Sequence, residues 1–157
     1  MDNMSMKKYE QNKNYFQSLL TLPEERLTKE TEQSKWSIRE IIGHIYHWDK
    51  FLLDVMVPQM SEGASLPEFP DHDAYNEKAM LHIVEFSTTK ELIAEFTLTR
   101  ELLLQNLSEI PVDTSFTIGK GKRIFTPEKF LEMFVEHDDH HIKQIEAFLK
   151  QQNIESC

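Results

Sequence analysis

Hydrophobic residues recur at helical spacing in several long stretches of this chain, whereas the alternation typical of strands is weak. Between Ile38 and Val55, apolar residues step by three and four positions, which places them along one face of a helix. Looser versions of the same pattern follow Tyr9, Leu92 and Phe130. The patterning predicts one short helix and four long ones, the short one near residues 73–84 and the long ones near 5–20, 37–57, 88–108 and 127–150.

Polar residues mark where two of the long helices begin. Ser37 and Glu40 have the spacing of a capping box, in which each side chain accepts a hydrogen bond from a free backbone amide of the first turn. Thr88 and Glu91 repeat this spacing before the third long helix. Both signals support helix starts at these positions.

The connections between the helices predict how the chain is arranged. Residues 59–72 contain the glycine and prolines of a long loop, which can cross over and leave the second and third long helices parallel. Residues 116–125 alternate weakly around two glycines and predict a small hairpin. We find no internal repeat and no domain boundary. We therefore expect one all-α domain over residues 1–157, a four-helix bundle.

Composition narrows the class of protein and its partners. The net charge of −10 disfavours nucleic acids and anionic membranes, which bind basic side chains. No apolar run is long enough to span a bilayer, and the first residues lack the apolar segment of a signal peptide. The only cysteine, Cys157, cannot form an internal disulfide. We expect a cytoplasmic protein that binds neither nucleic acid nor membrane.

Three histidines cluster within five residues toward the end of the sequence. His137 and His141 lie one helical turn apart, on the apolar face that also carries Phe130. Two inward imidazoles at this spacing can hold one divalent ion, about 2.0–2.1 Å from each nitrogen. They can equally be core histidines hydrogen-bonded to neighbours, because a buried polar group needs a partner. A metal site needs a third ligand from elsewhere, and His44 also faces inward from its helix.

Polar residues near these histidines are weaker candidates for chemistry. His47 and His140 lie toward polar edges, so we interpret them as exposed or boundary histidines. A proton shuttle is the alternative, because imidazole titrates near neutrality. Gln144 falls on the face of His137, where it can orient a ligand or a substrate. We therefore keep His47, His140 and Gln144 as weak catalytic candidates.

Other side chains in the two histidine-bearing helices are predicted to be structural. We interpret Asp138 and Asp139 as solvated charges on the helix surface. Three aromatic residues are interpreted as core packing rather than as a substrate pocket, namely Trp48, Phe51 and Phe134. No inward carboxylate is evident on the metal-bearing faces of these two helices, which slightly weakens a reaction that needs a carboxylate base near the ion. The first and third long helices remain open as the source of such a base.

Two motifs resemble those of a known family. The first is Trp-Ser-x-x-Glu-x-x-x-His, from Trp36 to His44, and the second is His-x-x-x-His with Gln-Ile shortly after, from His137 to Ile145. On these residues the chain resembles the DinB/YfiT-like superfamily of metal-binding four-helix-bundle proteins, over essentially its whole length. The resemblance implies an up-down-down-up bundle that pairs as a homodimer. It also implies one divalent ion, usually zinc or nickel, with the ligands His44, His137 and His141.

The resemblance further implies classes of activity. Known enzymes of the family are mostly S-transferases that use a low-molecular-weight thiol such as bacillithiol, mycothiol or glutathione, along with thiol-dependent isomerases, and some members are metal-dependent hydrolases. Three protein ligands leave a position open on the ion for a thiol or a water. We expect a thiol S-transferase that acts on a small molecule in detoxification or stress response. A metal-dependent hydrolase and a non-catalytic metal-binding protein are the alternatives.

Overall fold

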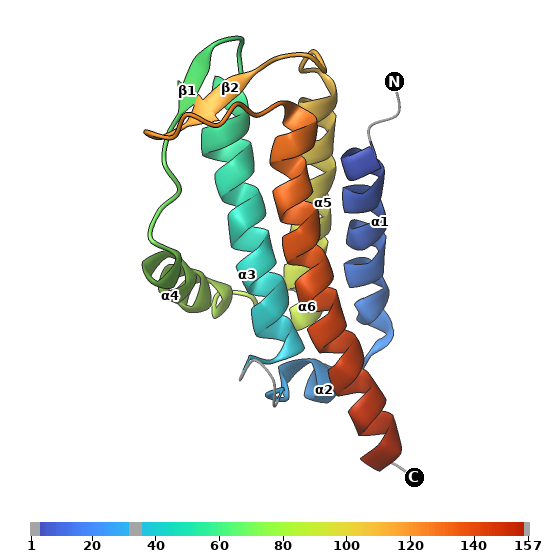
Figure 1. Cartoon of the computed structure of the whole chain (residues 1–157). Coiled ribbons are helices and arrows are strands. Elements are labelled where there is room, and N and C mark those ends of the chain that lie inside the picture. The colour runs from blue at the N-terminus through green and yellow to red at the C-terminus, as the bar shows by residue number, and fades with distance from the viewer. Residues whose placement is uncertain (1–3, 32–35, 156–157) are drawn as a thin grey trace.

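Four long helices stand side by side and form the body of the molecule (Figure 1). The computed structural model describes residues 4–31 and 36–155, with side chains through residue 152. The long helices are α1 (Met4–Ser18), α3 (Ile38–Phe51), α5 (Thr89–Ser108) and α6 (Pro127–Glu155). The shorter elements are α2 (Glu24–Thr28), β1 (Ala64–Leu66), α4 (His72–Ile83) and β2 (Phe116–Ile118). The predicted all-α class is confirmed. The second long helix keeps its predicted length only by continuing beyond α3 as a π-helical turn, Leu52–Met56, and a 3-10 turn, Val57–Gln59.

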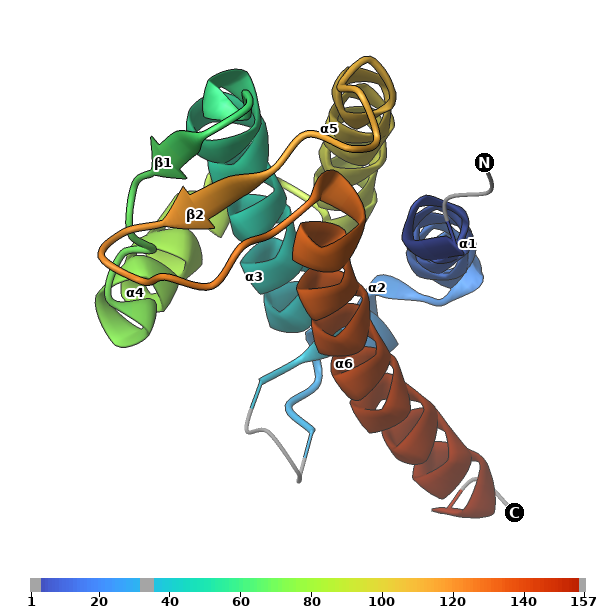
Figure 2. The same cartoon turned by 45° about the horizontal axis from the view of Figure 1, so that its top comes forward.

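The direction of the helices confirms the predicted topology. In Figure 1, α1 and α6 run down the bundle, while α3 and α5 run up it. Helix α3 packs on α5, α5 on α1, and α1 on α6. Neighbouring α3 and α5 are therefore parallel, and the chain between them crosses over through β1 and α4. Figure 2 shows α4 outside the group of four long helices, beside α3.

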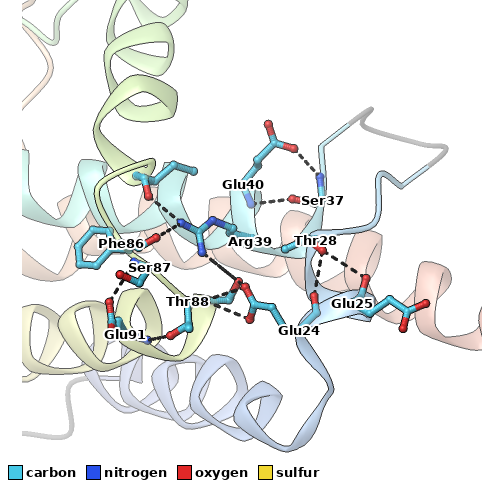
Figure 3. Close-up of polar contacts among 12 residues, drawn as sticks. Glu24, Glu25, Thr28, Ser37, Arg39, Glu40, Phe86, Ser87, Thr88 and Glu91 are labelled. Carbon is cyan, nitrogen blue, oxygen red and sulfur yellow. Dashed lines mark hydrogen bonds and ion pairs between the residues drawn. The ribbon is translucent and has the colours of Figure 1, made fainter.

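Side-chain caps set the starts of α3 and α5, as Figure 3 shows. The Ser37 hydroxyl accepts from the Glu40 amide at 3.1 Å, and the Glu40 carboxylate accepts from the Ser37 amide at 3.0 Å. This is the complete box that the sequence predicted. At α5 the Thr88 hydroxyl accepts from the Glu91 amide, but the Glu91 carboxylate accepts from Ser87 instead of Thr88. The second predicted box is therefore formed only on one side.

One arginine ties the crossover to the bundle. The Arg39 guanidinium, on the first turn of α3, donates to the carbonyl oxygens of Ile83 and Phe86 at 2.8 and 2.6 Å (Figure 3). It also lies 3.6 Å from the Glu24 carboxylate, which in turn accepts from the Thr89 amide at the start of α5. The end of α4 and the start of α5 are thus held to α3 by charge-assisted contacts.

The crossover contains a strand that the sequence did not predict. Residues 59–72, expected to be loop, include β1, which pairs in parallel with β2 from Ala64↔Phe116 to Leu66↔Ile118. The predicted hairpin over residues 116–125 is reduced to one antiparallel bridge, Phe116↔Phe125. Strands of three residues are too short to show a periodic pattern, and their pairing joins segments far apart in the sequence.

A layer of buried polar groups crosses the bundle between two hydrophobic clusters. One cluster includes Leu27 of α2 and Ile145 of α6, and the other includes Phe116 of β2 and Phe130 of α6. The polar layer draws one or two groups from each long helix, and its members are the Tyr9 hydroxyl, Asn12, Asp49, Arg100 and Asp138.

Arg100 is the centre of the polar layer and is fully buried. Its Nε donates to Asp49 Oδ2 at 2.8 Å, and its Nη1 donates to Asp138 Oδ2 at 2.7 Å. Its guanidinium carbon lies 3.5 Å from the centroid of the Tyr9 ring, and the Tyr9 hydroxyl donates to Asp49 at 2.6 Å. Burial alone lowers the pKa of Arg100, but the carboxylates of Asp138 and Asp49 more than offset this and hold it above its usual value.

The prediction for Asp138 was wrong, because this residue is buried rather than solvated, with 1% of its surface exposed. Asp139 is half-buried and accepts from the Asn12 amide at 3.2 Å. The structure also shows inward carboxylates on α3 and α6, Asp49 and Asp138, but both are held by Arg100. Burial raises the pKa of Asp138 to about 6 against the opposing effect of Arg100, since one guanidinium serves two carboxylates.

None of the helices among the described residues combines the length and apolar character needed to cross a bilayer.

Candidate metal centre

Helices α3 and α6 bring three histidines together inside the bundle. The ring nitrogens of His44, His137 and His141 that face one another all lie within 4.8 Å. His44 Nε2 is 2.9 Å from His137 Nε2, and the three ring centroids are 4.7 to 5.0 Å apart. His44 and His141 are buried and His137 is half-buried. The structure therefore assembles the three residues that the sequence singled out.

Local helix geometry explains this convergence. His137 and His141 are four residues apart on α6, so their side chains stack on one face. His44 comes from the middle of α3, where the Trp36 ring, just before the helix, lies 5.0 Å from its imidazole. The pair on α6 and the single residue on α3 thus face each other.

Hydrogen bonds fix the tautomer of His44. The Trp48 indole Nε1–H can only donate, and it lies 3.2 Å from Asn76 Oδ1, so this side-chain atom of Asn76 is an oxygen. The same oxygen lies 2.8 Å from His44 Nδ1, which must therefore carry the proton and donate. His44 Nε2 is therefore unprotonated, and its lone pair faces His137 Nε2 at a hydrogen-bond distance of 2.9 Å.

Gln144 fixes the tautomer of His141 in the same way. Its Oε1 accepts from His141 Nδ1 at 2.8 Å, while its amide nitrogen lies 3.4 Å from His140 Nε2. This arrangement leaves His141 Nε2 unprotonated. A hydrogen-bond partner on the far ring nitrogen is the usual way in which proteins orient a metal-binding imidazole and fix its tautomer.

Burial keeps all three imidazoles neutral. It lowers the pKa of His44 to about 4, helped by the neighbouring His141, and that of His137 to about 3, helped by His44. Burial also lowers the pKa of His141. Neutral imidazole is the form that binds metals. The 2.9 Å separation of the His44 and His137 nitrogens is close to the spacing of about 3.3 Å between ligands at tetrahedral zinc–nitrogen distances. The donor set therefore fits a divalent ion.

A cavity of about 370 Å³ opens beside this triad. Two of the three imidazoles, His44 and His137, form part of its wall. Most of the remaining wall is aromatic or apolar, and these other lining residues are Trp48, Phe69, His72, Asn76, Met133 and Phe134. We call it the aromatic cavity. Trp48 and Phe134, which the sequence analysis assigned to core packing, therefore face open space next to the histidines.

Comparison with known proteins places the chain in a family. The family model for the DinB superfamily matches residues 8–145. The chain belongs to the DinB superfamily. No curated protein sequence gives a significant match to this DinB superfamily member.

Two solved structures share its fold. YfiT from Bacillus subtilis, described as a probable metal-dependent hydrolase with an unusual four-helix bundle topology, is similar with a TM-score of 0.65 and 18% identity. That match covers 95% of this chain and 86% of YfiT. The mycothiol-dependent maleylpyruvate isomerase is similar with a TM-score of 0.69 and 14% identity, over 90% of this chain and 59% of the isomerase.

The weaker catalytic candidates lie around the triad and not in the aromatic cavity. His140 is exposed on α6 and contacts Gln144. His47 is half-buried, donates from Nδ1 to the Gly43 carbonyl oxygen at 3.0 Å, and lines a separate cavity with Tyr75. Gln144 lies against His141, as described above.

Sequence reasoning missed the contribution of α4 and the segment before it. Asn76 orients His44, and Phe69 and His72 line the aromatic cavity, yet none of them was singled out. Apolar and polar residues are spread almost evenly around α4, so its pattern does not show which face packs inward. An asparagine in a short helix of that kind carries no local signal of its role.

Proposed function

We propose that this DinB superfamily protein binds one divalent metal ion, zinc or nickel, through His44, His137 and His141. The observation that carries the proposal is the convergence of three neutral imidazoles, two of which, His44 and His137, form part of the wall of a cavity. In two of them, His44 and His141, the hydrogen bonds to Asn76 and Gln144 leave the metal-binding nitrogen unprotonated. Three protein ligands leave a position open, as in catalytic rather than structural zinc sites.

We propose further that the protein is an S-transferase that uses a low-molecular-weight thiol, in detoxification or stress response. The bound ion supplies positive charge that stabilises a thiolate near neutral pH. In the reaction the thiol loses its proton to solvent, its sulfur forms a bond to an electrophilic carbon, and the leaving group departs with the electron pair of the broken bond. The mycothiol dependence of the similar isomerase supports a thiol as co-substrate.

The residues of the chain prepare this chemistry in two ways. Neutral imidazoles leave the charge of the ion uncompensated, which favours an anionic thiolate. The aromatic cavity holds the electrophile beside His44 and His137. The sequence contains one cysteine, Cys157, which lies outside the described residues. The proposed sulfur donor is a separate thiol molecule.

A metal-dependent hydrolase is the second candidate, and one observation favours it. His72 is exposed at the aromatic cavity and can serve as a general base for a water molecule. YfiT, whose fold is similar, is described as a probable metal-dependent hydrolase. Against this candidate, the described residues that line the cavity include no carboxylate to act as the base.

Elemental analysis of the purified protein tests the metal site. We expect about one ion per chain in the unaltered protein and almost none in the His137→Ala/His141→Ala double variant. His140→Ala is the matched control, because this exposed histidine is on the same helix and should leave the metal content unchanged. Full occupancy in the double variant would rule out the proposed ligands.

The reaction is tested with an activated aryl halide or a bimane electrophile, with and without bacillithiol, cysteine or glutathione. The transferase predicts conjugation that depends on the thiol and disappears in His44→Ala. Cleavage of ester or amide substrates without a thiol would instead identify a hydrolase. Metal binding without either reaction would leave a non-catalytic metal-binding protein.

A further inference from the structure

The lining of the aromatic cavity restricts what it can hold. Its walls come from three parts of the chain: Trp48 on α3, Phe69 before α4, and Phe134 on α6. The Trp48 and Phe69 rings are 6.2 Å apart at 68°, and those of Phe69 and Phe134 are 5.9 Å apart at 59°. The three rings are thus tilted against one another and form one continuous apolar wall.

Charge is missing from this wall. Among the described residues that line the cavity there is no lysine, arginine, aspartate or glutamate. The Asn76 oxygen is already occupied, because it accepts from both Trp48 and His44. A cationic group that entered would lose its hydration without gaining an ionic partner, which is costly, and an anionic group would gain a partner only in the proposed metal ion. The separate cavity beside it contrasts with this, since Lys50 and Asp54 are part of its lining.

The size of the cavity sets the scale of the ligand. A volume of about 370 Å³ lies within the range of about 300–1,000 Å³ found for small-molecule sites. A dry apolar cavity of about 150 Å³ is enough for benzene. The aromatic cavity therefore accommodates one substituted ring or two fused rings.

We propose that the aromatic cavity binds the uncharged aromatic part of a small organic molecule, with Phe69, Trp48 and Phe134 as the residues that determine specificity. A flat ring that enters meets tilted aromatic neighbours in the edge-to-face and offset arrangements that such rings prefer. That this molecule is the electrophilic substrate rests on the function proposed above. The binding of this molecule does not rest on that function, because the aromatic walls of the cavity are present whether or not a reaction takes place.

Tryptophan fluorescence measures this binding directly. The sequence has two tryptophans, so Trp36→Phe leaves Trp48 as the only one. Nitroarenes quench indole fluorescence on contact, and three of them share a nitrophenyl ring whose second substituent is neutral, anionic or cationic: 4-nitroanisole, 4-nitrobenzoate and 4-nitrobenzyltrimethylammonium. In Trp36→Phe protein kept free of metal by a chelator, so that no ion can bind the carboxylate of 4-nitrobenzoate, we expect saturable quenching by the neutral probe. Its Kd should be at least tenfold lower than that of either charged probe.

Matched substitutions locate the site. Phe134→Leu removes one wall ring and should weaken binding of 4-nitroanisole by about 2- to 10-fold, the range for an aromatic pair. Phe51→Leu is the control, because Phe51 is also half-buried and lies 5.9 Å from the Trp48 ring, but lines the separate cavity. The Phe51→Leu variant should bind 4-nitroanisole with the same Kd as the protein that retains Phe51.

The outcomes separate this proposal from the proposed reaction. Equal or tighter binding of a charged probe, or no effect of Phe134→Leu, would overturn the proposed specificity even if thiol conjugation is observed. Selective binding of 4-nitroanisole without any conjugation would leave the specificity standing and remove the transferase.

Discussion

Replacing Arg100 with methionine is expected to cost this protein about 3–5 kcal/mol of folding free energy near pH 7.5, the usual penalty for removing one partner of a buried ion pair. The guanidinium donates hydrogen bonds to both oxygens of Asp49 and of Asp138. The side chains of these two carboxylates are at most 2% exposed. Methionine fills most of the space but leaves two carboxylates buried without a cation.

The folding free energy lost in Arg100→Met should also depend on pH. Without Arg100, burial and the neighbouring Asp49 carboxylate raise the pKa of Asp138 in the folded variant further above its unfolded value near 3.9. A group whose pKa is raised by folding favours the folded state at low pH and loses that contribution as the pH rises. The deficit relative to the unaltered protein should therefore be larger at pH 7.5 than at pH 5.

Urea denaturation followed by circular dichroism, at pH 5 and pH 7.5 and in the presence of a chelator, measures this deficit without a contribution from metal binding. Lys13→Met is a matched control, because Lys13 pairs at 3.3 Å with Glu101, which is 52% exposed. Its loss should stay below about 1 kcal/mol, as for exposed ion pairs. An Arg100→Met loss below about 1 kcal/mol, or one that is equal at both pH values, would refute the reasoning.

Three further predictions follow from the structure and the sequence. Asn76→Leu removes the acceptor that orients His44 and should lower the affinity for zinc or nickel by about 10- to 100-fold in a chelator competition, so an unchanged affinity would contradict that role. All four tyrosines should ionise above pH 10 in the folded protein, because burial raises the pKa of each, that of Tyr75 to about 12; absorbance at 295 nm would show a native transition near pH 10 if this is wrong. The contribution of the tyrosines to folding stability should accordingly be fully present below pH 10 and be lost as the pH rises toward 12. The homodimer implied by the family resemblance predicts twice the chain mass in sedimentation, and a concentration-independent monomer would contradict it.

Much of the fold was accessible from the sequence because its signals are local. The stripe from Ile38 to Val55 and the box of Ser37 with Glu40 each lie within one helix, where spacing alone determines the face or the cap. The pairing of His137 with His141 is also a local signal, because residues four apart lie one helical turn apart on the same face. The length of the crossover then allowed the parallel arrangement of the second and third long helices.

What the sequence could not show depends on partners in other helices. Asp138 looks like a surface charge because nothing near it in the sequence is its counterion; Arg100 is 38 positions away, on α5. Arg100 interrupts the apolar series between Phe96 and Leu103 and is the one local sign that a charge is buried there. The role of Asn76 depends in the same way on His44, 32 positions away, and on the Trp48 indole.

The path of the chain outside the bundle has a consequence for how such a protein can evolve. Phe69, His72 and Asn76 all belong to the crossover between α3 and α5, whereas the polar layer and the three histidines belong to the long helices. Connecting segments tolerate insertions and substitutions better than the elements they join. Mutation of the crossover at positions other than Asn76, which orients His44, can therefore change which molecules reach the triad while the three histidines and the charged interior are inherited unchanged. A family built on this plan can acquire new substrates by exchanging one segment.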